Sequence, residues 1–282
     1  MTAYILSITC RDTTGIIHAI SGALLRAEGN ILEQEQFSDV HTGLFFARTR
    51  FESPVEDPSA LEAAVAAELA VFEPTLHLRR QLDHRRALIM VSQYDHCLLD
   101  LLYRWSAGEL PLDITGIVSN HETCLPIADR YGLPYSLMPV TVANKAEQEA
   151  RLLEMVVDEQ VDLVILARYM QILSDRTCQA LAGRVINIHH SFLPGFKGAR
   201  PYHQAYERGV KLIGATAHFV TSDLDEGPII EQQVARVTHG ATPEDLAEVG
   251  RDIERLVLSR AVRLFAEDRV FVNDNRTVVF SG

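Results

Sequence analysis

The sequence has few cysteines, no long apolar run and a deficit of positive charge, and each shortage excludes a class of protein. Four cysteines, none in a Cys-X-X-Cys pair, exclude a zinc knuckle and a dense disulfide framework. No stretch of about 18 apolar residues is present, so we expect no membrane partner. A formal net charge of −12 without a long basic run disfavours nucleic acid. We expect a soluble, cytoplasmic protein that acts on a small molecule.

Two further ligand classes lack their motifs. Residues 92–96, which follow an expected strand, contain no glycine, so a dinucleotide cofactor is not expected. His189 and His190 are adjacent on an expected strand and point to opposite faces, and no third ligand has a recognised spacing, so a metal is not expected. Cys97, beside His96, stays open as a reactive thiol or a buried packing group.

The N-terminal part of the chain predicts a ferredoxin-like βαββαβ domain. Apolar alternation and helical spacing follow one another in that order, and the turn at 41–43 separates the second and third strands. The expected strands are 4–10, 31–37, 44–52 and 75–78, and the expected helices are 16–27 and 57–70. We place this domain at residues 1–80 and a basic linker at 81–86.

Residues 87–282 predict a second, α/β domain with a mostly parallel sheet, because strands alternate with helices. The apolar run 161–167 indicates a central strand buried on both faces. Asn144 with Glu147, and Thr242 with Asp245, predict two capped helices. The expected strands are 87–91, 112–118, 135–140, 161–167, 185–189 and 212–220.

Polar residues at strand ends are the candidates for chemistry, because open parallel sheets bind ligands there. Asn187 and His189 lie two residues apart on one strand, so both side chains leave the same face. Asp225 follows the next strand and would orient the imidazole. An amide donor beside a titratable imidazole suits an acyl carbon, whose oxygen becomes negative under attack. Taken singly, each residue is also compatible with a structural role.

The sequence around these residues resembles the folate-dependent formyltransferase family. The resemblance covers residues 186–194, 198–203, 218–220 and 224–228. It implies a Rossmann-like fold in which Asn187, His189 and Asp225 are catalytic, with either His189 or Asp225 as general base. It also implies a folate pocket, formed by Met170, Ile172, Leu173, Gly198, Glu226 and Gly227.

Residues 1–78 resemble an ACT domain, an amino-acid-sensing module, and the order of the two domains is similar to the formyltetrahydrofolate deformylase family. This resemblance implies hydrolysis of 10-formyltetrahydrofolate to formate and tetrahydrofolate, supplying formate for purine biosynthesis, with no cofactor beyond the folate substrate. Residues 92–96 depart from the glycine-rich phosphate turn of amine-directed transferases. The alternatives are formyl transfer to an amine and a non-catalytic folate- or amino-acid-binding protein.

The ACT resemblance further implies a homo-oligomer, a dimer or a tetramer, with an amino-acid effector. Asp12, Gly15, Asn30 and Ile31 are the candidates for the effector pocket by position, and a purely structural role fits them equally well. The identity of the effector stays open at this point.

Overall fold

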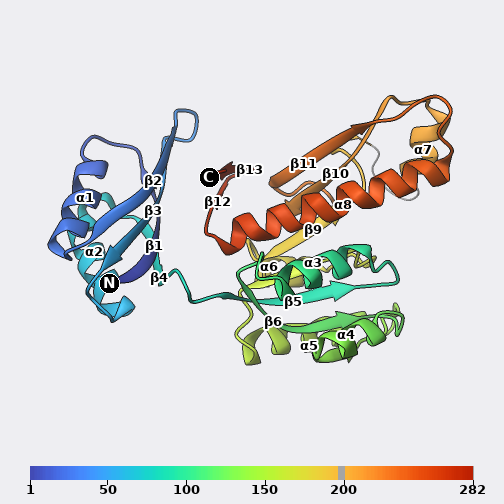
Figure 1. Cartoon of the computed structure of the whole chain (residues 1–282), viewed down its shortest axis with the longest axis horizontal. Coiled ribbons are helices and arrows are strands. Elements are labelled where there is room, and N and C mark those ends of the chain that lie inside the picture. Colours follow the sequence, from blue (N-terminus) through green and yellow to red (C-terminus); the bar gives the residue numbers. More distant parts are fainter. Residues whose placement is uncertain (196–200, 282) are drawn as a thin grey trace. The chain divides into compact units, whose positions relative to one another are not determined.

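The structure is a computed structural model that describes residues 1–195 and 201–281, and the chain divides into two compact units (Figure 1). The first unit comprises residues 1–84, 268–273 and 278–282, and the second comprises 85–267 and 274–277. The sequence suggested that 87–282 form one domain. The contacts instead assign residues 268–273 and 278–282 to the first unit.

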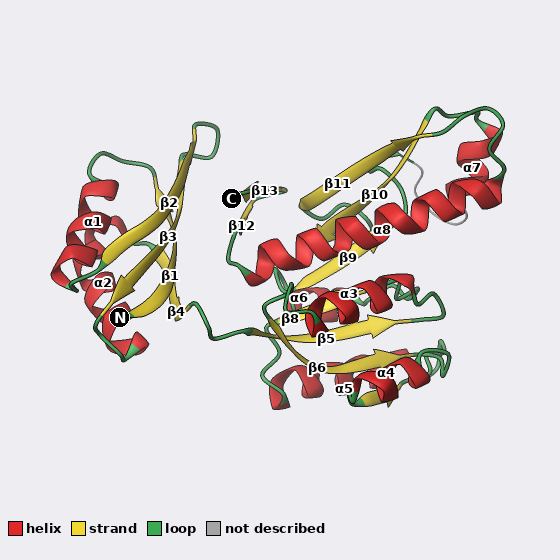
Figure 2. Ribbon diagram, in the orientation of Figure 1, coloured by secondary structure: helices red, strands yellow, loops and turns green. Residues whose placement is uncertain are grey.

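The first unit is built on a four-stranded antiparallel sheet with the order β2-β3-β1-β4. Its main elements are β1 (Thr2–Arg11), α1 (Ile16–Arg26), β2 (Asn30–Asp39), β3 (Leu44–Ser53), α2 (Pro58–Leu69), a 3₁₀ turn (Ala70–Phe72) and β4 (Thr75–Arg80). This βαββαβ order confirms the predicted ferredoxin-like fold. Figure 2 shows both helices on one face of the sheet, where their apolar residues meet those of β1 and β3 in one core.

The C-terminal segment of the chain adds to the other face of this sheet. Strands β12 (Val270–Asn273) and β13 (Arg276–Val279) form a two-stranded sheet. Phe271 and Phe280 pack with the fully buried Phe46 of β3. Arg269 forms ion pairs with Glu33 and Glu35 of β2 at 2.8 and 2.6 Å. The final residues therefore stabilise the N-terminal fold.

The second unit contains a seven-stranded sheet with the order β11-β10-β9-β8-β5-β6-β7. Its strands are β5 (Arg85–Val91), β6 (Leu112–Ser119), β7 (Tyr135–Leu137), β8 (Leu163–Leu166), β9 (Val185–His189), β10 (Leu212–Phe219) and β11 (Ile229–Arg236). Its helices are α3 (His96–Ser106), α4 (Leu125–Tyr131), α5 (Lys145–Asp158), α6 (Asp175–Ala180), α7 (Pro201–Glu207) and α8 (Pro243–Ala266).

Strands β5 to β9 of this sheet are parallel, which confirms the predicted α/β class with a mostly parallel sheet. Strand β10 pairs antiparallel with β9, and β11 pairs antiparallel with β10. Strand β11 was not predicted. Its central residues Glu231, Gln232 and Gln233 are polar, so the segment lacks the apolar alternation that would mark a strand.

Helix α8 runs along β9, β10 and β11 and also packs on α3 (Figure 1). Its predicted cap is confirmed, since Thr242 and Asp245 form a reciprocal capping box. The predicted box at Asn144 is wrong, because the Asn144 side chain accepts hydrogen bonds from Thr141 and not from its own helix. In the described part of the chain, no helix combines the length and apolarity that crossing a membrane requires.

Candidate active site

A cavity of about 850 Å³ opens in the second unit where β8 and β9 end. This is the edge at which a parallel sheet binds its ligands. Asn187, His189 and Asp225 all line this cavity. The structure therefore brings together the three residues to which the sequence assigned the chemistry.

His189 and Asp225 form a buried pair. The Nδ1 atom of His189 lies 3.2 Å from Oδ1 of Asp225, and the two side chains are only 5% and 10% exposed. When Nδ1–H of a neutral ring donates to the carboxylate, Nε2 carries no proton and is an acceptor. This Nε2 atom is buried and makes no hydrogen bond. The ring therefore presents an unused basic nitrogen beside the cavity.

The Asp225 carboxyl is held in its ionised form. Burial acts to raise its pKa, but the hydrogen bond from His189 and the electrostatic influence of His189, His218 and His190 outweigh burial, so the pKa falls below its ordinary value. Asp225 adopts a left-handed backbone with φ of 57°, a conformation that aspartate enters more readily than most residues other than glycine.

Asn187 is oriented by His218, a residue to which the sequence analysis gave no role. His218 lies opposite Asn187 in the β9–β10 register, and Nδ2 of Asn187 is 3.2 Å from Nε2 of His218. Nδ1 of His218 lies 2.9 Å from the Phe219 carbonyl, which can only accept, so the proton is on Nδ1 and Nε2 accepts from Asn187. Burial lowers the pKa of His218, which favours this neutral ring. The second N–H of the Asn187 amide remains for a ligand.

The expected folate residues divide into two groups. Met170, Ile172 and Leu173 follow β8 and line the cavity, and the first two are 51% and 59% exposed. The backbone of this loop is held by Ser92, whose hydroxyl accepts a hydrogen bond from Met170 N–H at 3.0 Å. Apolar side chains exposed at a cavity rim suit a flat aromatic ligand.

Glu226 and Gly227 are not among the residues that line the cavity, and Gly198 lies outside the described residues. Gly227 has a structural reason to be glycine, since a Cβ there would lie 1.8 Å from the Phe219 carbonyl oxygen. It therefore allows the loop that carries Asp225 to approach β10 closely.

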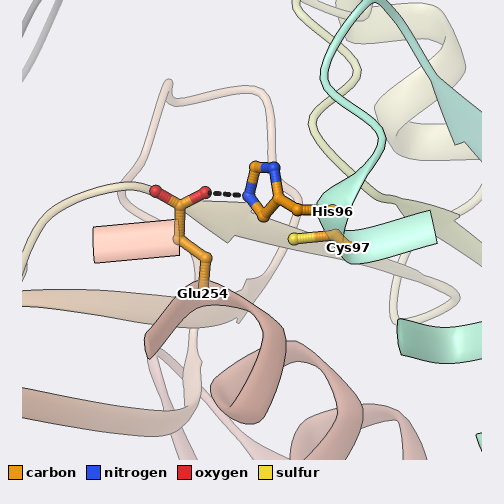
Figure 3. Close-up of side chains that lie close together, drawn as sticks. All are labelled: His96, Cys97 and Glu254. Atoms are coloured by element: carbon orange, nitrogen blue, oxygen red, sulfur yellow. Dashed lines mark hydrogen bonds and ion pairs between the residues drawn. The ribbon is translucent and has the colours of Figure 1, made fainter. Parts of the chain in front are cut away.

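Sequence reasoning also missed a buried charged cluster that reaches the same cavity. Glu254 of α8 accepts a hydrogen bond from the Tyr202 hydroxyl at 2.6 Å. It also pairs with His96 Nε2 at 2.8 Å (Figure 3). Its side chain is 1% exposed. A Glu on a long amphipathic helix normally faces solvent, so no local signal in the sequence marks it.

Comparison with known proteins gives the class of the second unit. Residues 85–262 match the family model described as formyl transferase. A glycinamide ribonucleotide transformylase from Symbiobacterium toebii superposes with a TM-score of 0.66 at 34% identity, over 70% of this chain and 94% of that one. The strands and the cavity just described therefore form a formyl transferase fold.

Two relatives extend over both units. A formyltetrahydrofolate deformylase from Corynebacterium sp. (strain P-1) is 46% identical over 98% of this chain and 97% of the relative. The crystal structure of a formyltetrahydrofolate deformylase from Burkholderia mallei has a TM-score of 0.95 at 49% identity, over 99% of this chain and 100% of that one. The chain belongs to the formyltetrahydrofolate deformylase family.

Proposed function

We propose that this chain hydrolyses 10-formyltetrahydrofolate to formate and tetrahydrofolate. The observation that carries the proposal is the His189 ring, whose Nδ1 is fixed by Asp225 while its Nε2 is buried without a hydrogen bond beside the cavity. A nitrogen in that state is a proton acceptor of the kind that activates water. The named activity of full-length relatives agrees with this chemistry.

In the first step, Nε2 of His189 removes a proton from a water molecule as its oxygen bonds to the formyl carbon. The ionised Asp225 stabilises the imidazolium that forms. In the second step the C–N bond breaks, and the imidazolium returns its proton to the departing folate nitrogen. Two residues, His189 and Asp225, are candidates for the general base. The geometry favours His189, because Oδ1 of Asp225 already contacts the ring.

Asn187 supplies the group that stabilises the intermediate. Attack on the formyl carbon places negative charge on its oxygen, and the N–H of Asn187 that is not directed at His218 is the donor for this oxyanion. Removal of one such donor typically slows acyl chemistry by about 10²- to 10³-fold. His218 acts by holding the amide in this orientation.

The folate itself binds against the apolar wall of the cavity. Met170, Ile172 and Leu173 offer the contact surface for the pterin ring. Glu226 and Gly227 belong to the loop beside Asp225 that we propose to close over it. No step of this mechanism needs a cofactor or a metal beyond the folate substrate.

Formyl transfer to an amine is the competing activity, since the same three residues would serve it. The test is release of formate from 10-formyltetrahydrofolate by the purified protein, with and without glycinamide ribonucleotide as acceptor. Hydrolysis predicts equal formate release in both conditions. Consumption of substrate only with the amine present would establish transfer, and binding of folate without consumption would establish a non-catalytic role.

We assign the first unit to regulation, as an ACT-like module that binds an amino-acid effector and joins subunits. Its sheet ends in β2, an edge strand with exposed Leu32 and Phe37. Edges of this kind invite pairing with another chain. We propose that the protein assembles through this unit as a dimer or a tetramer. We also propose that it works in the cytoplasm and supplies formate to purine biosynthesis. Light scattering after gel filtration, with methionine or glycine added, tests both the assembly and the effector.

A further inference from the structure

Arg168 stands out because its position is both strained and buried. It follows β8 with φ of 64°, a left-handed conformation that side-chain-bearing residues rarely adopt. The residue is nevertheless 8% exposed and lines the cavity that contains His189. A large charged residue held in strained backbone inside a cavity indicates a functional constraint.

The buried cluster described above fixes the Arg168 side chain. Nε lies 3.5 Å from Oε2 of Glu254, and the guanidinium carbon lies 5.1 Å from the centre of the Tyr94 ring. Burial acts to raise the pKa of Glu254, but the hydrogen bonds from His96 and Tyr202 and the charge of Arg168 lower it overall. The Glu254 carboxylate is therefore ionised, and its ion pair with Nε and the Tyr94 ring hold the guanidinium in place.

A metal is a poor occupant of this cluster. The ligand atoms of His96, Cys97 and Glu254 lie within 4.8 Å of one another (Figure 3). Both oxygens of Glu254 already have partners, however, and burial raises the pKa of the Cys97 thiol well above its usual range. The positive charge of Arg168 beside the carboxylate also repels a cation.

The guanidinium of Arg168, a residue that lines the cavity, lacks part of its hydrogen bonding. Nη1 of Arg168 is buried and makes no hydrogen bond, and Nε has only its ion pair with Glu254 at 3.5 Å. A buried donor without an acceptor is costly, and the cost is greater for a charged group. His189 lines the same cavity, and its Nε2 also makes no hydrogen bond. The guanidinium needs an acceptor, whereas Nε2 of His189 needs a donor such as the attacking water, so an anionic ligand would complete the guanidinium alone.

We propose that Arg168 binds the carboxylate of formate, in a product subsite beside the reacting centre. The inference rests on the proposed hydrolysis, which generates a one-carbon carboxylate in this cavity. The planar fork of arginine matches a carboxylate better than any other side chain does. Arg168 and His189 line the same cavity, so the subsite and the catalytic histidine share one cavity.

A carboxylate of the folate glutamate tail would have the same chemistry, so the experiment separates the two sources. Dissociation constants for formate and for tetrahydrofolate are measured separately, formate by ¹³C-formate line broadening in the absence of folate. The variants are Arg168→Met, which removes the charge, and Arg168→Lys, which keeps it without the fork. Arg151→Met, at an exposed position of α5, is the matched control.

Arg168→Met is expected to weaken formate binding about tenfold or more, which is the loss of one or two charge-assisted hydrogen bonds. Arg168→Lys should give an intermediate value, and the control should match the wild type. Tetrahydrofolate affinity should change less than twofold. Glu254→Gln, which loosens the anchor and keeps Arg168, should also weaken formate binding, and thermal melting shows whether each variant is folded.

Equal formate affinity in folded wild type and Arg168→Met would overturn the subsite. A parallel loss of tetrahydrofolate affinity would assign Arg168 to the folate tail and would equally overturn it. Turnover is measured in a separate assay on the wild type. An inactive wild type would refute the proposed function. An active enzyme whose formate affinity does not change when Arg168 is substituted would refute only the subsite.

Discussion

At the residue scale, the site depends on two histidines that differ in what their neighbours offer. His189 faces an ionised carboxylate and keeps Nε2 unused, whereas His218 donates to a backbone carbonyl and accepts from Asn187. One ring is therefore available for proton transfer, and the other only orients a side chain. Asp225 lies near both, at 3.2 Å from His189 and 3.8 Å from His218.

Asp225→Asn is predicted to lower kcat by about 10²- to 10⁴-fold, because the amide cannot hold the imidazolium or fix its tautomer. Substrate affinity should change little, since the carboxylate is directed at His189. Steady-state kinetics of formate release measure both values. Asp129→Asn, on the exposed surface of α4, is the control and should keep full activity. A kcat within threefold of wild type would remove Asp225 from the mechanism.

The buried ring of His190 makes the free energy of unfolding depend on pH. Burial, with help from the charge of Arg168, lowers its pKa to about 3 from 6.5. Between pH 6.5 and pH 3, His190 is protonated in the unfolded chain and unprotonated in the folded chain. The contribution of the neutral ring to the free energy of unfolding is therefore fully present above pH 6.5 and is lost as the pH falls toward 3. Each pH unit in this window costs at most about 1.4 kcal/mol.

The free energy of unfolding should therefore decrease less between pH 7 and pH 5 in His190→Gln than in the wild type, by about 1 to 2 kcal/mol. Urea unfolding followed by fluorescence of Trp105 measures this, because the only tryptophan of the sequence lies in the second unit. His239→Gln, at an exposed position, should leave the slope unchanged. The same slope in wild type and His190→Gln would contradict the assignment.

At the element scale, the loop between β10 and β11 sets where Asp225 lies. Gly227 allows this loop to approach β10, because any Cβ there would collide with the Phe219 carbonyl. The loop backbone is further held by Phe219 N–H, which donates to the Pro228 carbonyl at 2.9 Å. Catalysis thus depends on a residue that carries no side chain.

Gly227→Ala is predicted to lower kcat by at least about tenfold, because the shifted loop displaces Asp225, and displacements near 1 Å cost up to about a hundredfold. Kinetics of formate release provide the test. Gly240→Ala is the matched control, since a Cβ at Gly240 would meet nothing within 4 Å. If both variants retain wild-type kcat, the close approach at Gly227 does not position the site.

The sequence predicted those parts of the site that depend on local periodicity. Asn187 and His189 share a face because strand side chains alternate, and Thr242 caps α8 by a short-range rule. Arg168, His218 and Glu254 were missed because their roles come from contacts between distant segments. The hydrogen bond of His96 to Glu254 spans 158 residues, and no local pattern encodes such a pairing.

At the scale of the whole molecule, the last residues of the chain return to the first unit. Asn273 donates to the Asp39 carboxylate at 2.6 Å, and Arg79 pairs with Asp268 at 2.5 Å. Phe280 is 7% exposed in a small core with Phe46. The N-terminal fold is therefore completed only after the second unit has been synthesised.

Phe280→Ala should destabilise the first unit by about 3 kcal/mol, as expected for loss of a buried aromatic ring. Hydrogen exchange measured by mass spectrometry should show faster exchange in β1 and β3 and no change in β5 and β8. Val40→Ala, at a position 87% exposed, is the control. Unchanged protection of β3 would show that the C-terminal segment does not stabilise the first unit.

The most direct test of the proposed hydrolysis is single-turnover release of formate from 10-formyltetrahydrofolate by the wild type and by His189→Gln. Glutamine cannot accept the proton of the attacking water, so we expect formate from the wild type and a rate at least about 10³-fold lower for the variant, with folate still bound. A His189→Gln protein that releases formate at the wild-type rate would contradict it.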